Sequence, residues 1–132
     1  MVLALSIDDN DASGHTGLAF LYLQQREYDK SIAEAMKAVT LDPGSYSVNY
    51  CYATVLEFAG RGQESLPLFE KVERLNPAGW PGLYFDYGRA LMGVGRIQDA
   101  TVQFKKAIDR APNYLPPRVY LTAAYVMDGR EK

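Results

Sequence analysis

Cysteine, histidine and tryptophan each occur once in this sequence of 132 residues, and no long hydrophobic run is present. The single cysteine, Cys51, cannot form an internal disulfide, which excludes a disulfide-stapled secreted scaffold and favours a reducing compartment. The apolar runs fall far short of the roughly 20 residues that span a bilayer. The first residues, MVLALSIDDND, lack the basic flank and the length of a signal peptide. We therefore expect a soluble, cytoplasmic protein.

An excess of charge of either sign is also missing. Fourteen lysines and arginines stand against sixteen aspartates and glutamates, which gives a net charge of -2. The basic surface of a protein that binds nucleic acid or anionic membranes is therefore not expected. Hydrophobic residues make up 48% of the chain, which is enough apolar content to fold. This length allows one domain, or a short stack of small units with a continuous core.

Proline recurs at a regular interval. Pro43, Pro77 and Pro112 each follow a helix-like stretch, and they are separated by 34 and 35 residues. Blocks aligned on these prolines share small residues, large apolar residues and turn residues at fixed positions. The small residues are Ala19, Ala53 and Gly88, the large ones are Tyr22, Leu56 and Leu91, and the turn residues are Arg26, Gly60 and Gly95. Self-similarity at this period predicts a repeat architecture.

Each block contains two helical patterns that are separated by a short polar turn and closed by the proline. Proline ends the second helix because it lacks an amide hydrogen and restricts the preceding residue. The predicted helices are residues 12–25 and 28–41, 46–59 and 63–75, and 81–94 and 97–110. Pro67 falls near the first turn of the helix at 63–75 and is expected to delay its start.

The sequence resembles the tetratricopeptide repeat (TPR) family, whose 34-residue helix-turn-helix unit has a W-x2-L-G-x2-Y, A-x3-F, A, P skeleton. The third block matches it best, with Tyr84 in the Trp position followed by Tyr87, Gly88, Leu91, Gly95, Ala100, Phe104, Ala107 and Pro112. The resemblance implies an all-α fold, an α-solenoid of antiparallel helix pairs that forms a TPR superhelix.

The repeats form one predicted domain over residues 1–132. Three repeats cover residues 12–45, 46–79 and 81–114, residues 1–9 are the tail of a preceding repeat, and residues 115–132 are the first helix of a fourth. The stretches LEFAGR, YGRALMGVGR and YLPPRVYLTAAYVMDGRE are also similar to TPR regions that lie C-terminal to bacterial signalling enzymes such as class III nucleotide cyclases.

The resemblance also implies a binding surface, because the first helices of stacked TPR units line a concave groove that holds partner peptides. The residues predicted to line this groove are Phe20, Leu23, Tyr50, Thr54, Glu57, Phe85, Arg89, Met92, Val119 and Ala123. Most of them are apolar or aromatic, and Arg89 is the one positive group among them. In related chaperone-tail receptors Lys, Asn and Arg clamp a terminal carboxylate. The corresponding positions here are Thr16, Phe20, Cys51, Gly82 and Asp86, so no clamp is expected.

We therefore predict a protein-interaction scaffold that binds an apolar or amphipathic peptide segment, with Arg89 fixing one acceptor. The alternative is a structural spacer or self-association module of a larger signalling protein, which forms a homodimer through unpaired terminal helices. The groove side chains could also pack on one another or on a neighbouring copy. A third alternative, RNA recognition by a related 35-residue repeat, is disfavoured by the acidic balance.

No set of residues predicts catalysis, a cofactor or a metal ion, and we do not expect an enzyme. His15 has no second histidine and no cysteine near it, so a packing role is expected. Cys51 falls in mid-helix without a neighbouring cation to stabilise a thiolate. Asp8, Asp9 and Asp11 lack the glycine and the terminal glutamate of a calcium loop and are expected to be solvated capping carboxylates.

Overall fold

The computed structural model describes residues 10–77 and 79–129, which contain α-helices joined by turns and no β-strand. The helices in this part of the chain are α2 (Ala12–Gln24), α3 (Tyr28–Leu41), α4 (Tyr46–Phe58), α5 (Gly62–Leu75), α6 (Pro81–Gly93), α7 (Ile97–Arg110) and α8 (Pro116–Asp128). The all-α prediction is confirmed. Each of the six helices predicted between residues 12 and 110 is present, with ends that shift by at most one residue. The predicted tail of a preceding repeat, residues 1–9, lies outside the described residues.

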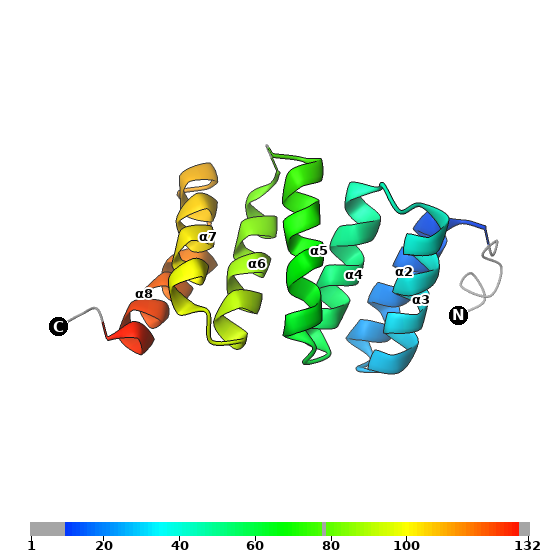
Figure 1. The fold of residues 1–132 in the computed structure, drawn as a ribbon, viewed down its shortest axis with the longest axis horizontal. Helices are drawn as coiled ribbons and strands as arrows, with labels where there is room; N and C mark the ends of the chain where they lie inside the picture. Colours follow the sequence, from blue (N-terminus) through cyan, green and yellow to red (C-terminus); the bar gives the residue numbers. More distant parts are fainter. Residues whose placement is uncertain (1–9, 78, 130–132) are drawn as a thin grey trace. The chain divides into compact units, whose positions relative to one another are not determined.

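The chain forms two compact units, residues 1–75 and residues 76–132, which we call the N-terminal and C-terminal units. In the N-terminal unit α2 pairs with α3 and α4 pairs with α5, and α4 also packs on α2 and α3. In the C-terminal unit α6 pairs with α7, while α8 packs on α7 and more lightly on α6. Figure 1 shows the two helices of each pair side by side. The predicted architecture of repeated helix pairs is confirmed, and the single-domain assignment stays a prediction.

Small residues on the first helix of each pair allow the second helix to approach closely. In the N-terminal unit the buried cluster comprises Ala19, Ile32, Ala35, Cys51, Val55 and Leu56. In the C-terminal unit Gly88 lies against Phe104, and a Cβ atom added to Gly88 would be 2.6 Å from the Phe104 ring. The glycine therefore makes room for a large ring, which is how helix pairs reach the packing density of a protein interior.

Each hairpin turn has the same cap at the end of its first helix. The residue after the C-cap is left-handed, with φ of 61° at Arg26, 81° at Gly60 and 87° at Gly95. The following amide donates back to the last turn in all three cases, from Glu27 to Tyr22, from Arg61 to Leu56 and from Arg96 to Leu91, each at 2.9 Å. This is the Schellman motif. Glycine adopts its left-handed position freely, whereas Arg26 carries a side chain there.

Replacing Arg26 with glycine is expected to stabilise the N-terminal unit. A left-handed conformation costs a non-glycine residue roughly 1–2 kcal/mol, and part of the gain is offset because glycine loses more backbone entropy on folding. We expect the free energy of unfolding to rise by about 0.5–1 kcal/mol, measured by urea denaturation with circular dichroism. Gly60→Ala is the matched control and should lower the same quantity, because it introduces the strain that Arg26 already carries. A loss of stability in Arg26→Gly would contradict this account.

The proline that closes a block is tied to the first helix of the next block. One side chain at the fourth position of each following block donates to the proline carbonyl. These bonds run from Asn49 Nδ2 to Pro43 at 2.9 Å, from Tyr84 Oη to Pro77 at 3.0 Å and from Arg118 Nε to Pro112 at 3.1 Å. Three residue types thus make one hydrogen bond at the Trp position of the repeat. Departures from the family pattern at this position therefore do not disturb the register.

Pro67 does not delay the start of α5, and this expectation was wrong. The helix begins at Gly62 and contains Pro67 in its interior. The amides of Glu64 and Ser65 donate to the Arg61 carbonyl at 3.1 and 3.2 Å, and the Ser65 hydroxyl donates to the Gly62 carbonyl at 2.7 Å. These bonds fix the first turn of α5. The helix is therefore already formed ahead of Pro67, which has no amide hydrogen to donate.

Candidate functional site

The predicted groove residues of the N-terminal unit lie on α2 and α4, which pack against each other. Phe20 on α2 is 38% exposed, and Leu23 is partly buried against the core cluster. Tyr50 on α4 is partly buried, and its ring stacks on Tyr46 with centroids 6.4 Å apart. Thr54 is buried, and its hydroxyl makes no hydrogen bond within the described residues. Phe20 and Tyr50 are therefore the aromatic side chains of this set that a partner could reach.

In the C-terminal unit the predicted set falls on α6 and α8. Val119 on α8 is 56% exposed, while Met92 and Ala123 are partly buried. Phe85 is only 8% exposed because aromatic rings surround it. Ring centroids lie 6.2 Å away for Phe104, 6.0 Å for Tyr114 and 5.1 Å for Tyr120. The burial of Phe85 corrects the prediction that its ring lines an open groove, since α8 and the segment before it cover the ring.

Arg89, the predicted positive group of the groove, is engaged with its own helix. Its guanidinium lies 3.4 Å from the carboxylate of Asp86, one turn earlier, and 5.2 Å from the centroid of the Phe85 ring. The side chain is 21% exposed. The i,i+3 spacing brings the two charges together on one helix face, so the charge of Arg89 is partly balanced inside the unit. Glu57, the remaining member of the predicted set, is partly buried on α4.

None of the five clamp positions carries a cation in the structure. Thr16 donates its hydroxyl to the Ser13 carbonyl at 2.7 Å within its own helix, and Cys51 is fully buried. Gly82 has no side chain, and Asp86 presents a carboxylate next to Arg89. A terminal carboxylate would meet no lysine or arginine at these positions.

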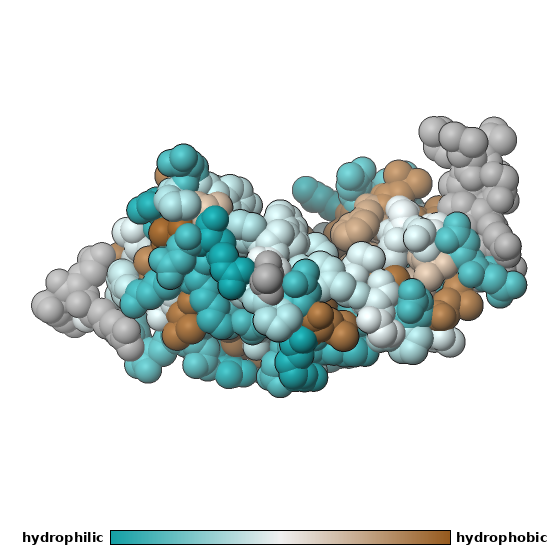
Figure 2. All heavy atoms as spheres, turned by 90° about the horizontal axis from the view of Figure 1, so that it is seen from above, coloured by the Kyte–Doolittle hydropathy of each residue, from teal (hydrophilic) through white to brown (hydrophobic). Residues whose placement is uncertain are grey.

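Exposed hydrophobic side chains also occur outside the predicted groove, and sequence reasoning did not single them out. Figure 2 shows hydrophobic residues at the surface of both units, among hydrophilic ones. Among the described residues they include Tyr28, Met36 and Phe58 in the N-terminal unit, and Trp80, Leu115 and Met127 in the C-terminal unit. Periodicity alone does not reveal them, because every amphipathic helix also has apolar residues at its edges.

His15 is buried and lies against a partly buried carboxylate. Its Nδ1 lies 2.6 Å from Oε1 of Glu34, which joins α2 to α3, and Lys37 Nζ lies 3.1 Å from Oε2 of the same carboxylate. Burial raises the pKa of Glu34, but the hydrogen bonds from His15 and Lys37 outweigh it, and the pKa lies below its ordinary value of 4.5. The packing role expected for His15 is what the structure shows.

The Glu34 carboxylate is expected to make stability depend on pH in the acid range. Because its pKa is lowered on folding, its contribution is present above pH 4.5 and is lost as the pH falls through the folded value. The wild type should therefore lose more unfolding free energy than Glu34→Gln between pH 6 and pH 3, as measured by urea denaturation. Parallel pH curves for the two proteins would contradict this assignment. Glu70→Gln, which alters an exposed pair with Arg74, is the control and should behave as wild type.

Cys51 is fully buried within the N-terminal unit. Its thiol lies 3.9 Å from the Thr16 carbonyl, and burial raises the pKa of the thiol to about 12. We expect an aromatic disulfide reagent to leave Cys51 unmodified in the folded protein at pH 8 and to react fully in 6 M guanidinium, because the thiolate is the nucleophile. Rapid reaction of the folded protein would show that the helix pair around Cys51 opens readily.

The described residues offer no metal site and no membrane span. No group of three His, Cys, Asp or Glu side chains in residues 10–77 and 79–129 could hold a metal ion. Asp11 occupies the N-cap of α2 but makes no side-chain capping bond, while Asp8 and Asp9 lie outside the described residues. In the same part of the chain no helix is both long and apolar enough to cross a bilayer.

Solved structures of other proteins share this fold. MamA from Desulfovibrio magneticus RS-1 superposes with a TM-score of 0.84 at 21% identity, over 91% of this chain and 67% of that chain. The first TPR domain of Spaghetti (RPAP3), bound to the HSP90 peptide SRMEEVD, gives 0.84 at 16% identity over 93% and 97%. YrrB, described as a TPR protein with an unusual peptide-binding site, gives 0.79 at 20% identity over 92% and 62%. At these identities the likeness shows the fold.

No curated protein matches the sequence. The similarity to the TPR regions of class III nucleotide cyclases stays a prediction, which the structures above do not support. The family model for the tetratricopeptide repeat matches residues 12–45 and 81–114. These two ranges of 34 residues together cover just over half of the 132-residue chain. The protein therefore belongs to the tetratricopeptide repeat family.

Proposed function

We propose that this protein is an interaction module that binds an apolar or amphipathic peptide segment across the first helices of its repeats. TPR proteins generally act as interaction modules rather than as enzymes. Among the structures with the same fold, the RPAP3 domain holds an HSP90 peptide, and YrrB is described as having a peptide-binding site. These relatives support a peptide ligand, and the side chains of this chain indicate which kind.

The observation that carries the proposal is the pair of accessible aromatic side chains on α2 and α4. Phe20 and Tyr50 are both reachable from solvent, and they lie on two first helices that pack together. Between Ala12 and Gln24, α2 has no acidic or basic residue other than His15. A surface of this composition favours a ligand that buries aromatic or aliphatic side chains. For the C-terminal unit by itself we propose a surface of the same kind, with Met92, Val119 and Ala123 on α6 and α8.

The ligand chemistry differs from that of a carboxylate clamp. Thr16, Phe20 and Cys51 provide no cation for a terminal carboxylate, and the same holds for Gly82 and Asp86. The affinity should therefore come mainly from apolar anchors and should not depend on a free carboxyl terminus. A peptide with an amidated end should bind as tightly as the same peptide with a free end.

The proposal can be tested with peptides of 12 residues that are selected from a random display library on the full chain. Their affinities would be measured by titration calorimetry for wild type, Phe20→Ala and Tyr50→Ala. Met36→Ala is the matched control, because Met36 is an exposed apolar residue on the second helix α3. We expect each groove variant to weaken binding by about tenfold or more and the control to bind as wild type. Equal affinities for all four proteins would remove this surface as the binding site.

A second candidate function, self-association, is favoured by the exposed side of α8. Leu115, Val119, Val126 and Met127 are each more than half exposed, although α8 packs on α7 and α6 within the described residues. An apolar helix face of this kind is able to bury itself against a second copy. Light scattering over a hundredfold dilution should then show a dimer that dissociates, and Val126→Asp with Met127→Asp should be monomeric throughout. A wild type that remains monomeric at every concentration would exclude this function.

A further inference from the structure

A shallow pocket lies in the N-terminal unit where α2 ends and α3 begins. It shares only Leu23 with the predicted groove residues. It encloses about 390 Å³ and is lined by Leu23, Gln24, Arg26, Tyr28 and Phe58. Leu23 and Gln24 end α2, Arg26 lies in the turn, Tyr28 begins α3 and Phe58 ends α4. Tyr28 is 37% exposed and Phe58 is 48% exposed. The pocket thus offers two accessible aromatic rings over a floor that includes Leu23, which packs on the core.

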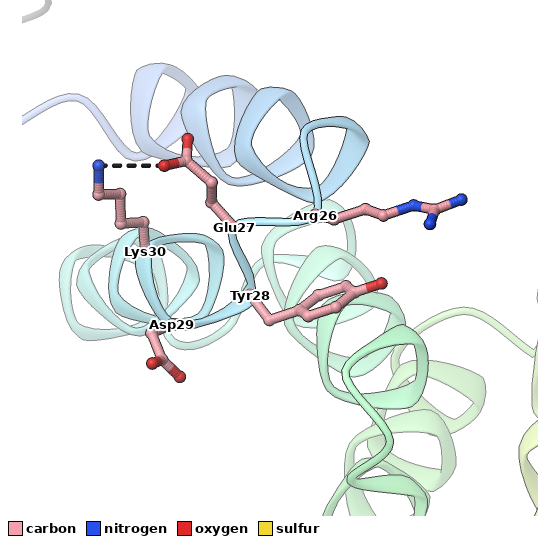
Figure 3. Close-up of a pocket in the computed structure, with 5 residues that line it drawn as sticks. All are labelled: Arg26, Glu27, Tyr28, Asp29 and Lys30. Atoms are coloured by element: carbon pink, nitrogen blue, oxygen red, sulfur yellow. Dashed lines mark ion pairs between the residues drawn. The ribbon is translucent and has the colours of Figure 1, made fainter.

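The Arg26 guanidinium stands at the rim of this pocket without a carboxylate partner among the described residues. Figure 3 shows Arg26 and Tyr28 extending to the same side of the turn, whereas Glu27 points to the other side toward Lys30. Glu27 and Lys30 form an ion pair at 3.2 Å. The nearby cation Arg61 is already paired with Glu64 at 2.6 Å. Among the described residues Arg26 thus forms no ion pair, whereas Lys30 and Arg61 each do.

The fold itself does not require arginine at this position. The equivalent residues of the other two hairpins are Gly60 and Gly95, which adopt the same left-handed conformation without a side chain. Arg26 adopts it with a full side chain, at a steric cost that glycine avoids. Its side chain is also exposed, so it contributes no buried packing. The Arg26 side chain extends to the same side of the turn as Tyr28 (Figure 3), and a glycine would remove it.

We infer that this pocket is a second docking site, which binds a partner protein segment carrying an aromatic or aliphatic side chain next to a carboxylate. The apolar side chain would fill the space between Tyr28 and Phe58. The carboxylate would pair with the Arg26 guanidinium, whose planar donors match a carboxylate with two parallel hydrogen bonds. A single cation suits a carboxylate better than a phosphate group, because a phosphate carries more charge and more acceptors to satisfy. Aromatic rings with an adjacent arginine are also the residue types that most often anchor protein interfaces.

The test uses the full chain and a set of synthetic octapeptides, acetylated and amidated at their ends. Each peptide contains one phenylalanine and one glutamate separated by zero to three serines, in a glycine-serine background. Matched peptides replace the glutamate with glutamine or the phenylalanine with alanine. Binding is followed by amide chemical shifts in the 15N-labelled protein. We expect at least one Phe–Glu peptide to shift the amides of residues 23–28 and 56–60, and its Phe–Gln and Ala–Glu counterparts to bind roughly tenfold more weakly.

Two variants connect this binding to the pocket. Arg26→Gly removes the cation while keeping the left-handed turn, and it is expected to fold at least as well as wild type, so a loss of binding cannot come from unfolding. Phe58→Ala removes one ring of the pocket. Each should weaken the Phe–Glu peptide by about tenfold, while Arg96→Gln, at the corresponding edge of the C-terminal unit, should leave it unchanged. Phe20→Ala should also leave it unchanged, which separates this site from the peptide surface of α2 and α4.

The inference would be overturned if every Phe–Glu peptide failed to bind, if the Phe–Gln series bound equally well, or if binding to Arg26→Gly were undiminished. A shift of the amides of residues 23–28 that follows protein concentration rather than added peptide would identify a second copy as the occupant and would also overturn it.

Discussion

Replacing Phe85 with alanine is expected to lower the unfolding free energy of the C-terminal unit by about 3–5 kcal/mol. The ring is 8% exposed and is in contact with the rings of Phe104, Tyr114 and Tyr120. Removing it leaves a cavity between α6, α7 and the entry to α8, and the surrounding helices close that space only in part. The total unfolding free energy of a small domain is only about 5–15 kcal/mol. The loss expected for this one substitution is therefore a large fraction of that total. Urea denaturation followed by circular dichroism gives the value.

The matched control for Phe85→Ala is Val119→Ala. Val119 was predicted to line the same groove, but it is more than half exposed, so its replacement should change stability by less than about 0.5 kcal/mol. If the two variants had equal stability, the aromatic cluster around Phe85 would not form. The comparison also matters for function. Because Phe85 is buried, we expect a loss of peptide binding in Phe85→Ala to result from unfolding of the C-terminal unit and not from the loss of a direct contact with the peptide.

Gly88→Ala is expected to destabilise the C-terminal unit by about 1–3 kcal/mol, although alanine is the better helix former. The added Cβ would lie 2.6 Å from a ring carbon of Phe104, which is fully buried and has no room to move away. The gain in helix propensity from glycine to alanine, about 1 kcal/mol, only partly offsets the overpacking. The measurement is again the free energy of unfolding in urea.

Gly17→Ala provides the control that isolates helix propensity. Gly17 lies inside α2, and a Cβ added there meets no atom within 4 Å. This variant should become more stable by up to about 1 kcal/mol, opposite in sign to Gly88→Ala. A Phe104→Leu change in the Gly88→Ala background should cost less than the two single changes added together, because the smaller side chain relieves the contact. Strict additivity would place the strain somewhere other than the contact between Gly88 and Phe104.

The two proposed binding surfaces of the N-terminal unit call for different ligand chemistry. The face with Phe20 and Tyr50 has no lysine or arginine at the clamp positions, so apolar side chains are expected to provide most of its affinity. The pocket beside Arg26 combines two aromatic rings with an exposed cation that forms no ion pair among the described residues. Salt should therefore weaken binding at the Arg26 pocket more than binding at the face of α2 and α4, because only the former includes an ion pair with the ligand.

The helices could be predicted closely because each local signal agrees with the others. Pro43, Pro77 and Pro112 end three helices for reasons that act within a few residues. Gly60 and Gly95 identify turns that need a left-handed residue, and the same spacing predicts that Arg26 occupies the equivalent turn of the first hairpin. Small residues such as Ala19 and Gly88 mark the close approach of paired helices. These are short-range properties of the chain, and each of them recurs in successive repeats of the sequence.

The exposure of individual groove residues could not be predicted in the same way. Tyr50 and Phe85 occupy equivalent places on the first helices of their repeats, yet Tyr50 is only partly buried whereas Phe85 is 8% exposed. The difference comes from Tyr114 and Tyr120, which cover Phe85 from beyond its own hairpin. Helical periodicity shows which face of a helix a side chain occupies. It does not show how many neighbours from other elements reach that face.

The amino-acid sequence by itself determined the period, the helices, the turns and the membership of this chain in a repeat architecture, since proline, glycine and helical spacing act locally. Only the tertiary structure decided that Asn49, Tyr84 and Arg118 each donate a hydrogen bond to the carbonyl of the proline that precedes their helix. It also decided that Arg89 pairs with Asp86. It also decided that Arg26 stands beside two exposed rings. These features depend on distances between side chains of different turns and helices, which are set when the helices pack and the backbone of each turn is fixed.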